Sequence, residues 1–418
     1  MRVRIGKEWD AETTNSRDIL AITMDMMVTR IRIVYPPNRR LSNWPINLCW
    51  IFRRTGSNLQ WLSAVLLLAS LASTTWAQSL DPALKVVEQA VHDGRIPGAT
   101  VLIMQHGKVV VQRSFGVCNI DSQREFAADT ICWIASLTKP VTVTAAMKLV
   151  ESGKLQLDAP VANYIPELGQ LRTGDGTKQP VTIRQLMSHS SGIPASVPLR
   201  DSYFFTQQWY DHSLDQVVQQ IATRPLDFKP GTQVHYSNAA PYVLGRIVEV
   251  VAERPFGQFV QQEILQPLEM LDTGFSVPPA KIPRTAVVYR RELERLKVYC
   301  RYDPQWNVQM TMPDGGLFST PSDIAKFANA FLESSAGVLS EESVTAMLTK
   351  QNEMYGLGWI LDKEDQFSHW GSSGTLVWAD RRTGVVGVFF SQLQDFALLA
   401  ELREQFRSAV DAAFASRL

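Results

Sequence analysis

The spacing of apolar and polar residues predicts that the body of the chain begins and ends with segments of one β-sheet. Two apolar, β-branched runs near residue 100 are joined by His106-Gly107, a two-residue turn typical of a β-hairpin. A second pair of runs near residue 380 flanks a polar turn, and helical spacing follows or precedes each pair. Strands are expected at 99–105, 108–115, 374–379 and 385–391, and helices at 80–92 and 398–414.

The middle of the chain has a different pattern. Residues 136–345 show mostly helical spacing, interrupted by Pro and Gly. We therefore expect an α+β fold, an α/β sandwich in which an antiparallel sheet formed from both ends is flanked by helices and carries an inserted, mainly helical domain. The clearest helices of this insertion are expected at 141–151, 214–223, 241–253 and 323–332.

The first 77 residues form a separate region. They hold ten Lys and Arg against five Asp and Glu, whereas the whole chain of 418 residues has 41 of each. A charge-free stretch follows Arg53 and Arg54, with an apolar core at 61–72 and small residues ending at Ala77. This is the layout of a secretory signal peptide, although an uncleaved anchor stays open despite a core shorter than a span of about 20 residues.

The expected organisation has three parts. Residues 1–52 are an extension before the true start, 53–77 are the signal peptide, and 78–418 are one catalytic domain with its helical lobe at about 136–345. The protein is then exported, to the periplasm or the medium. The formal net charge of zero gives no reason to expect a nucleic acid or an obligate membrane partner, and the sequence does not specify the oligomeric state.

Cysteine and histidine spacing indicates neither a disulfide framework nor a metal centre. Cys118, Cys132 and Cys300 are an odd and sparse set without C-x-x-C spacing, so one bridge is possible but not assignable. The six histidines are never two or four residues apart, which excludes H-x-H and H-E-x-x-H patterns. A metallohydrolase is therefore disfavoured.

Ser136 and Lys139 form an S-x-x-K pattern at the expected start of a helix. One helical turn places the lysine amine on the same face as the serine hydroxyl, and Pro140 is tolerated only in a first turn. The helix N-terminus favours developing negative charge. Because about one such tetrad is expected by chance in this composition, a capping serine followed by a solvated lysine is the alternative.

Tyr236 and Asn238 lie two residues apart on a segment between a Pro-Gly turn and the next expected helix. A phenol and an amide in this arrangement can face one cleft, where the phenol moves a proton and the amide holds a substrate carbonyl. The alternative is a core tyrosine followed by a helix-capping asparagine.

His369, Gly371 and Ser372 precede the run at 374–379. A Gly-rich lead into an edge strand lets backbone N–H groups approach a substrate, and histidine supplies a group that titrates near pH 6.5. The alternative is a loop whose glycines serve only the turn.

Taken in order, these elements resemble the serine beta-lactamase and penicillin-binding-protein superfamily, specifically its class C-like branch. The resemblance runs from about Ile96 to the C-terminus and implies the same α+β fold. Further segments that resemble the branch are L-M-S-H-S-S-G-I-P at 186–194, P-G at 230–231, G-G-L-F-S-T-P-S-D at 315–323 and Y-G-L-G-W at 355–359.

The resemblance implies a role for each candidate residue. Ser136 would be the acylated nucleophile, and Lys139 and Tyr236 would share the proton transfers. Asn238 would bind the acyl side of the substrate, while the backbone N–H groups of Ser136 and Ser372 would form the oxyanion hole. No cofactor and no metal are implied.

The third motif departs from that of class C beta-lactamases, which carry Lys-Thr-Gly where this chain has His369-Trp370-Gly371. His-x-Gly is commoner among related D-Ala-D-Ala carboxypeptidases, D-aminopeptidases and carboxylesterases. A neutral imidazole binds a carboxylate less strongly than lysine does, so efficient beta-lactamase activity is not expected. If His369 must be neutral, activity should fall below about pH 6.5.

The expected function is that of an exported serine hydrolase acting on a small ester, amide or peptidoglycan-type substrate. A true beta-lactamase and a non-catalytic binding or assembly protein are the alternatives. The aromatic segment Tyr203-Phe204-Phe205 with Trp209-Tyr210 is a candidate cleft wall or, equally, a packed loop.

Overall fold

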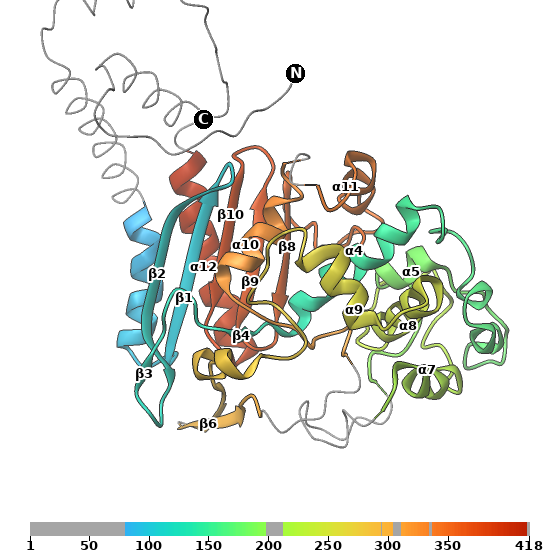
Figure 1. Cartoon of the computed structure of the whole chain (residues 1–418), viewed down its shortest axis with the longest axis horizontal. Coiled ribbons are helices and arrows are strands. Elements are labelled where there is room, and N and C mark those ends of the chain that lie inside the picture. Colours follow the sequence, from blue (N-terminus) through green and yellow to red (C-terminus); the bar gives the residue numbers. More distant parts are fainter. Residues whose placement is uncertain (1–79, 198–211, 294, 304–310, 334–336, 416–418) are drawn as a thin grey trace, which may run out of the picture. The chain divides into compact units, whose positions relative to one another are not determined.

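The structure, a computed structural model, describes residues 80–197, 212–293, 295–303, 311–333 and 337–415 (Figure 1). The expected extension and signal peptide at 1–77 lie outside these residues, as does the aromatic segment from Tyr203 to Tyr210. Within the described ranges, none of the helices combines the length and the apolar character needed to cross a membrane.

A six-stranded antiparallel sheet joins the two ends of the catalytic region. Its strands are β1 (Gly98–Gln105), β2 (Lys108–Asn119), β3 (Arg124–Glu125), β8 (Gln366–Gly371), β9 (Thr375–Asp380) and β10 (Val385–Phe390). The order β3-β2-β1-β10-β9-β8 places β1 directly beside β10, about 280 residues later in the chain (Figure 1). The α+β fold and the sheet built from both ends are thereby confirmed.

Helices cover both faces of this sheet. The helix at 80–92 and α12 (Phe396–Ala415) share one apolar cluster with alternate residues of β1, including Val101 and Ile103, whereas Leu102 and Met104 belong to the cluster on the opposite face. There, α10 (Pro321–Asn329) lies against the sheet (Figure 1). Since neither face meets water, β1 and β10 are apolar at nearly every position, which is why their sequence shows continuous runs.

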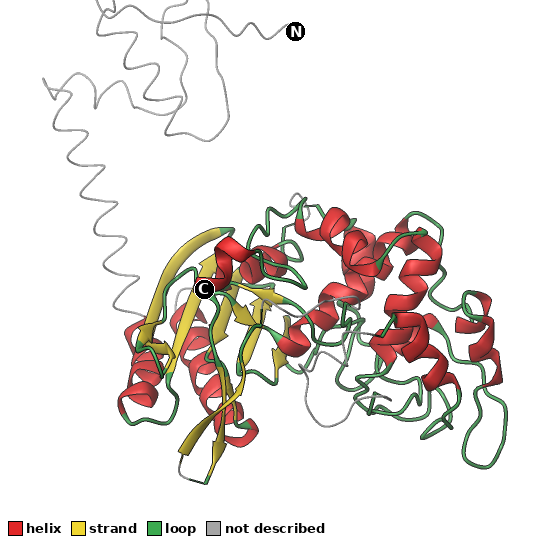
Figure 2. Ribbon diagram, turned by 60° about the horizontal axis from the view of Figure 1, so that its bottom comes forward, coloured by secondary structure: helices red, strands yellow, loops and turns green. Residues whose placement is uncertain are grey.

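The segment between β4 (Cys132–Trp133) and β8 is mainly helical, as expected, and most of its helices lie to one side of the sheet (Figure 2). Its α-helices are α4 (Thr138–Glu151), α5 (Ile183–Met187), α7 (Leu214–Ala222), α8 (Ala240–Ala252), α9 (Phe256–Val260), α10 and α11 (Glu341–Met347). Short 3-10 helices lie at Ala135–Leu137 (η1), Val161–Asn163 (η2), Pro166–Gln170 (η3) and Pro279–Arg284 (η5), and a π-helix at Gln261–Leu265 (η4).

The same segment contains strands that the sequence pattern did not indicate. β5 (Val288–Glu292) and β6 (Arg295–Cys300) form a hairpin, and β7 (Phe318–Ser319) pairs with β4. Beyond this segment, β11 (Leu393–Gln394) runs parallel to β5. The hairpin is rich in Arg, Lys and Glu, and Glu292 pairs with Arg290 and Lys297. Charges paired along a half-exposed hairpin mask the alternation by which a strand is recognised.

β8 corrects the expectation for the third motif. We expected His369 and Gly371 in a Gly-rich lead into an edge strand at 374–379, but they belong to β8, which is itself the edge strand, and only residues 372–374 form the turn to β9. The polar Gln366 is buried in β8 because its Oε1 atom accepts hydrogen bonds from Arg407 of α12 at 2.6 and 3.0 Å. A strand with buried polar residues does not show an apolar run.

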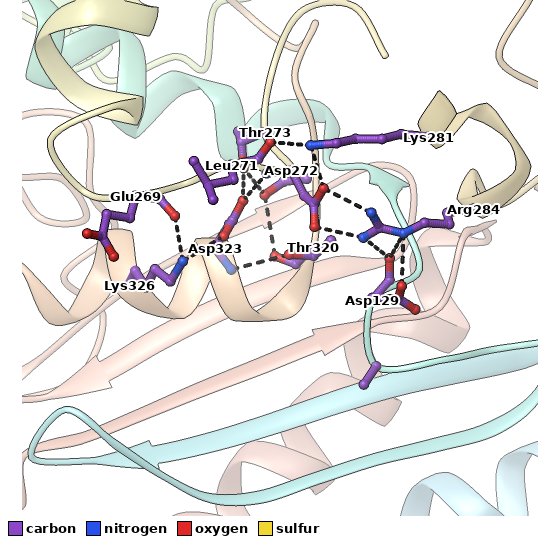
Figure 3. A network of polar contacts seen from close by, with 12 residues as sticks. Asp129, Glu269, Leu271, Asp272, Thr273, Lys281, Arg284, Thr320, Asp323 and Lys326 are labelled. Carbon is purple, nitrogen blue, oxygen red and sulfur yellow. Dashed lines mark hydrogen bonds and ion pairs between the residues drawn. The ribbon is translucent and has the colours of Figure 1, made fainter. Parts of the chain in front are cut away.

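A network of charges near β4 ties four surface segments together (Figure 3). We call it the Asp272 network: Asp129, Asp272, Lys281, Arg284, Asp323 and Lys326. Arg284 donates to both carboxylate oxygens of Asp272 at 3.0 and 2.7 Å and also pairs with Asp129 at 3.0 Å. The backbone N–H of Asp272 donates to Asp323 at the start of α10 (2.8 Å). The network therefore joins η5, the loop before it and α10 to the segment that leads into β4.

Cys118, Cys132 and Cys300 are free thiols. Burial raises the pKa of the Cys132 thiol well above its usual value. Of the bridges that the sequence left open, none is formed among the described residues.

Candidate active site

Ser136 lies in η1, the short 3-10 turn that runs directly into α4. The preceding residue, Ala135, has a φ of 47°, a left-handed conformation that is uncommon for a residue with a side chain. The turn is held by Thr138, whose hydroxyl donates to the Ala135 carbonyl (2.7 Å) and accepts the N–H of Leu317 (3.1 Å). Backbone strain fixed in this way is a feature of functional sites.

Lys139 lies in the first turn of α4 and is only 2% exposed. Its Nζ atom is 3.1 Å from Ser136 Oγ, 2.9 Å from Asn238 Oδ1 and 2.8 Å from the Asp314 carbonyl oxygen. The amide and carbonyl oxygens can only accept, so each takes one N–H of the amine. The remaining position of the amine faces the Ser136 hydroxyl, which either accepts from an ammonium ion or donates to a neutral amine.

Tyr236 and Asn238 reach the same amine from the extended segment before α8. The ring centroid of Tyr236 is 4.8 Å from Lys139 Nζ, within the range of a cation–π contact. The backbone N–H of Asn238 donates to the Ala195 carbonyl (3.1 Å), and Ser237 Oγ donates to the Pro194 carbonyl (2.9 Å). The two predicted side chains are thus brought to Ser136 by a segment anchored on the loop at 189–195.

His189 is a site residue to which the sequence analysis gave no role. Its ring lies between Tyr236 and Tyr355, at centroid distances of 4.6 and 4.8 Å, and its Nδ1 atom accepts the N–H of Ser237 (3.2 Å). Burial, with a smaller contribution from the Lys139 charge, lowers the pKa of His189 well below its usual value. A neutral imidazole therefore supports the Tyr236 ring. His189 lies in the segment 186–194 that carries the family resemblance, but its spacing from Tyr236 in the sequence did not indicate that the two rings are in contact.

His369 is buried in β8, with 1% of its surface exposed. Its Nδ1 atom is 2.9 Å from the Trp370 carbonyl oxygen, which can only accept, so Nδ1 carries the proton. Burial and the charge of Lys139 lower the pKa of His369 to about 3. The expectation of a group titrating near pH 6.5 is therefore wrong. Nε2 is an acceptor that has no hydrogen-bond partner among the described residues.

Gly371 and the turn after it lie against the segment that leads to Ser136. A Cβ atom at Gly371 would come within 2.3 Å of both the Ile134 carbonyl oxygen and Thr375 Oγ1, so only glycine fits. Ser373 Oγ donates to the Trp133 carbonyl (2.6 Å) and Thr375 Oγ1 to the Ile134 carbonyl (3.1 Å). These contacts place the turn that contains Ser372 beside η1.

A groove of about 1000 Å³ has Tyr236 in its wall. Neutral amide and hydroxyl side chains contribute much of the remaining lining, among them Gln185, Ser190, Gln351 and Asn352. Over the part of the chain that the structure describes, no three His, Cys, Asp or Glu side chains are grouped so that they could hold a metal ion. The groove is large enough for a small organic molecule, and of the candidate residues Tyr236 lines it, whereas Ser136 and Lys139 are not in its wall.

Known proteins share this fold and part of this sequence. Esterase EstB of Burkholderia gladioli is 35% identical over 227 residues, 53% of this chain and 56% of EstB. A Mycobacterium tuberculosis protein described as uncharacterized is 33% identical over 295 residues, 65% of this chain and 72% of the relative.

Solved structures extend the similarity of fold. EstCE1, described as a hydrolase with promiscuous acyltransferase activity, has a TM-score of 0.71 at 22% identity and covers 81% of this chain and 99% of its own. A penicillin-binding protein homologue from Pyrococcus abyssi has a TM-score of 0.62 at 25% identity, over 74% and 72% of the two chains.

The family model described as Beta-lactamase matches residues 84–411, from the first described helix to the last. That span includes each candidate residue from Ser136 to Ser372. This protein therefore belongs to the beta-lactamase family.

Proposed function

We propose that this protein is a serine hydrolase that cleaves small esters through an acyl-enzyme on Ser136. The observation that carries the proposal is the position of Lys139 Nζ, 3.1 Å from Ser136 Oγ, with its other hydrogen bonds directed to Asn238 and Asp314. A serine hydroxyl is a weak nucleophile unless a neighbouring base takes its proton. Lys139 is held where it can do so.

In the proposed acylation, Ser136 Oγ forms a bond to the ester carbonyl carbon while its proton passes to Lys139 Nζ. The carbonyl oxygen becomes an oxyanion, which the backbone N–H groups of Ser136 and Ser372 stabilise. Collapse breaks the bond to the alcohol oxygen, and that oxygen takes a proton from Lys139 or through the Tyr236 phenol. Water then repeats these steps to release the acid and restore Ser136.

The state of His369 supports an ester rather than a beta-lactam as the substrate. Its imidazole is neutral, and Nε2 offers a lone pair instead of a positive charge, so it provides no cation for a substrate carboxylate. The 35% identity to Esterase EstB agrees with this choice. A D-Ala-D-Ala peptide also ends in a carboxylate, and its cleavage is tested as the alternative.

The experiment compares the turnover of p-nitrophenyl butyrate, a chromogenic cephalosporin and a D-Ala-D-Ala peptide by the purified protein. Ser136→Ala should abolish ester turnover, whereas the matched variant Ser122→Ala, at the exposed turn between β2 and β3, should leave it unchanged. A fluorophosphonate should add its mass to the peptide that contains Ser136. Ester turnover that survives in Ser136→Ala would refute the proposal, and dominant cephalosporin or peptide turnover would correct the substrate.

Export completes the proposal and rests on the signal-like segment at 53–77 alone. Determination of the N-terminus of the protein recovered from its own cells tests it. A new N-terminus near residue 78 is expected, and a mature chain that retains residues 53–77 would contradict cleavage.

A further inference from the structure

Arg403, on α12, is a buried arginine that contacts the turn of the candidate oxyanion hole. It is 7% exposed. Its Nε atom donates to the carbonyl of Leu399 (2.8 Å), and its Nη1 atom donates to the carbonyls of Thr375 (3.1 Å) and Gly371 (3.4 Å). The last two residues lie at the two ends of the turn from β8 to β9, where they face each other across the ladder.

The partners of Arg403 are unusual for a buried arginine. Among the described residues no carboxylate lies within ion-pair distance of it, whereas Arg407, one helical turn later and equally buried, pairs with Asp362 at 3.3 Å. Burial lowers the pKa of Arg403 to about 10, so the side chain still carries its charge at neutral pH. A buried cation that no anion balances is costly and is a candidate for a role beyond stability.

Gly371 and Ser372 share one peptide group, and this links Arg403 to the chemistry. The carbonyl that accepts from Arg403 belongs to Gly371, and the N–H of the same peptide unit belongs to Ser372. A charged donor on the oxygen of a peptide increases the positive partial charge on its N–H, because hydrogen bonds in a chain polarise one another. Together with the Gly374 N–H, which donates to the same oxygen at 3.1 Å, the Arg403 bond fixes the orientation of the peptide plane.

We propose that Arg403 is a positioning residue of the oxyanion hole, which holds and polarises the Gly371–Ser372 peptide so that the Ser372 N–H stabilises the oxyanion. The inference rests on the proposed function, because it assigns that N–H to the transition state. The hydroxyls of Ser373 and Thr375 fix the turn to the Trp133–Ile134 backbone, but they are neutral. Arg403 is the charged contact at this turn, and the Trp370 ring lies 5.0 Å from its Cζ atom.

The test compares Arg403→Met, Arg403→Lys and the matched control Arg407→Met, all in the full chain. Three quantities are measured for each variant: kcat/KM for p-nitrophenyl butyrate, and the affinities for an alkyl trifluoromethyl ketone and for the corresponding secondary alcohol. Ser136 Oγ adds to the carbonyl carbon of the ketone, and the ketone oxygen becomes a tetrahedral oxyanion. The alcohol occupies the site without that charge. Circular dichroism and thermal unfolding report on the fold.

Arg403→Met should lower kcat/KM and the ketone affinity by the same factor, roughly 10- to 100-fold, somewhat less than the loss of a whole oxyanion donor. The alcohol affinity should change by less than about threefold, since it forms no oxyanion. Arg403→Lys should recover part of both losses because it keeps the charge. Arg407→Met should lower thermal stability without separating the two affinities.

Ketone and alcohol affinities that fall together, or a kcat/KM within about threefold of the wild type, would overturn the inference. If Arg403→Met does not fold, Arg403→Lys decides, because a lysine that leaves kcat/KM and ketone affinity unchanged shows that the arginine contacts are not used. Ester turnover that persists in Ser136→Ala would instead refute the proposed function itself, so the two failures are distinguishable.

Discussion

Arg284 in the Asp272 network and Arg403 behind the candidate active site show two opposite ways of holding an arginine. Arg284 is 28% exposed and bonds both oxygens of the Asp272 carboxylate, which raises the pKa of the guanidinium above its usual value (Figure 3). Arg403 is buried on backbone carbonyls, and desolvation lowers its pKa to about 10. The charge of Arg284 is balanced by the Asp272 carboxylate. The charge of Arg403 is buried without such an anion, at a cost in desolvation.

The two regions therefore contribute differently to the molecule. In the Asp272 network opposite charges meet near water, where ion pairs give modest stability and nothing remains to act on a substrate. In the candidate active site Lys139 and Arg403 bond hydroxyl, amide or carbonyl oxygens, so the Lys139 amine is directed at the serine and the Arg403 charge acts on the peptide of the turn. We expect substitutions in the first region to change stability and those in the second to change rate.

The largest difference in kcat/KM is expected between variants of one lysine from each region, Lys139 and Lys326. Lys139→Met should lower kcat/KM for a p-nitrophenyl ester by roughly a thousandfold or more, because it removes the proposed base beside Ser136. Lys326→Met removes a lysine that bonds Asp323 and the Glu269 carbonyl, and it should leave kcat/KM unchanged. Equal losses in both variants, measured by steady-state kinetics, would abolish the distinction.

A smaller but still large effect is expected at Gly371. In Gly371→Ala the added Cβ would meet the Ile134 carbonyl and Thr375 Oγ1, so β8 must move away from η1. A displacement of about 1 Å at the oxyanion turn should reduce kcat/KM roughly 100-fold. Gly174→Ala is the matched control, since nothing lies within 4 Å of a Cβ there. An active Gly371→Ala enzyme would show that the turn is not part of the site.

Arg284→Met should mainly lower stability. We expect the free energy of unfolding to fall by about 1 kcal/mol, since the pair with Asp272 is partly exposed to solvent. That corresponds to a decrease of about 1–2 °C in the midpoint of thermal unfolding of a domain of this size. Arg295→Met, on the exposed side of β6, serves as the control, and kcat/KM should not change in either variant.

The sign of the pH dependence follows from the pKa of Asp272. Arg284 and Lys281 hold this pKa below its usual value of 3.8. The stabilisation is therefore complete above that value and is lost as the pH falls below it, when the folded protein takes up the proton. The stability difference between the wild type and Arg284→Met should be constant from neutral pH to about pH 5 and should shrink in more acidic solution.

The smallest effect is expected from the protonation of His369 during catalysis. Because its pKa is lowered to about 3, the residue stays neutral over the range of an ordinary assay. The ratio of kcat/KM between the wild type and His369→Gln should therefore not depend on pH between about 5.5 and 8. A ratio with a midpoint near pH 6.5 would show that His369 titrates after all.

The lowered pKa of His369 should nevertheless be visible in the pH dependence of the free energy of unfolding. Between about pH 6.5 and the lowered pKa the unfolded chain binds a proton that folded His369 does not, so stability should decrease as the pH falls through that range. His189, whose pKa is also lowered by burial, adds to the same decrease.

The local features of the fold and site were predictable from the sequence. The continuous apolar runs of β1 and β10 and the helical spacing of α12 indicated a sheet with helices on it, and these elements lie within two residues of their expected positions. The three-residue spacing of Ser136 and Lys139 placed amine and hydroxyl together because the helical turn is a local geometry. The ordered motifs indicated the family, which the matched residues 84–411 confirm.

Only the tertiary structure decided what surrounds these groups. The carbonyl of Asp314 that binds Lys139 is 175 residues away along the chain, and the burial that makes His369 a permanent acceptor comes from segments remote in sequence. β8 could not be recognised from the sequence because its buried Gln366 is polar and is satisfied by Arg407, which is distant along the chain. The contact of Arg403 with the turn could not be predicted either, since the helix that carries it has an ordinary amphipathic pattern. Spacing along the chain fixes local geometry, whereas desolvation and the pairing of charges depend on which distant segments pack together.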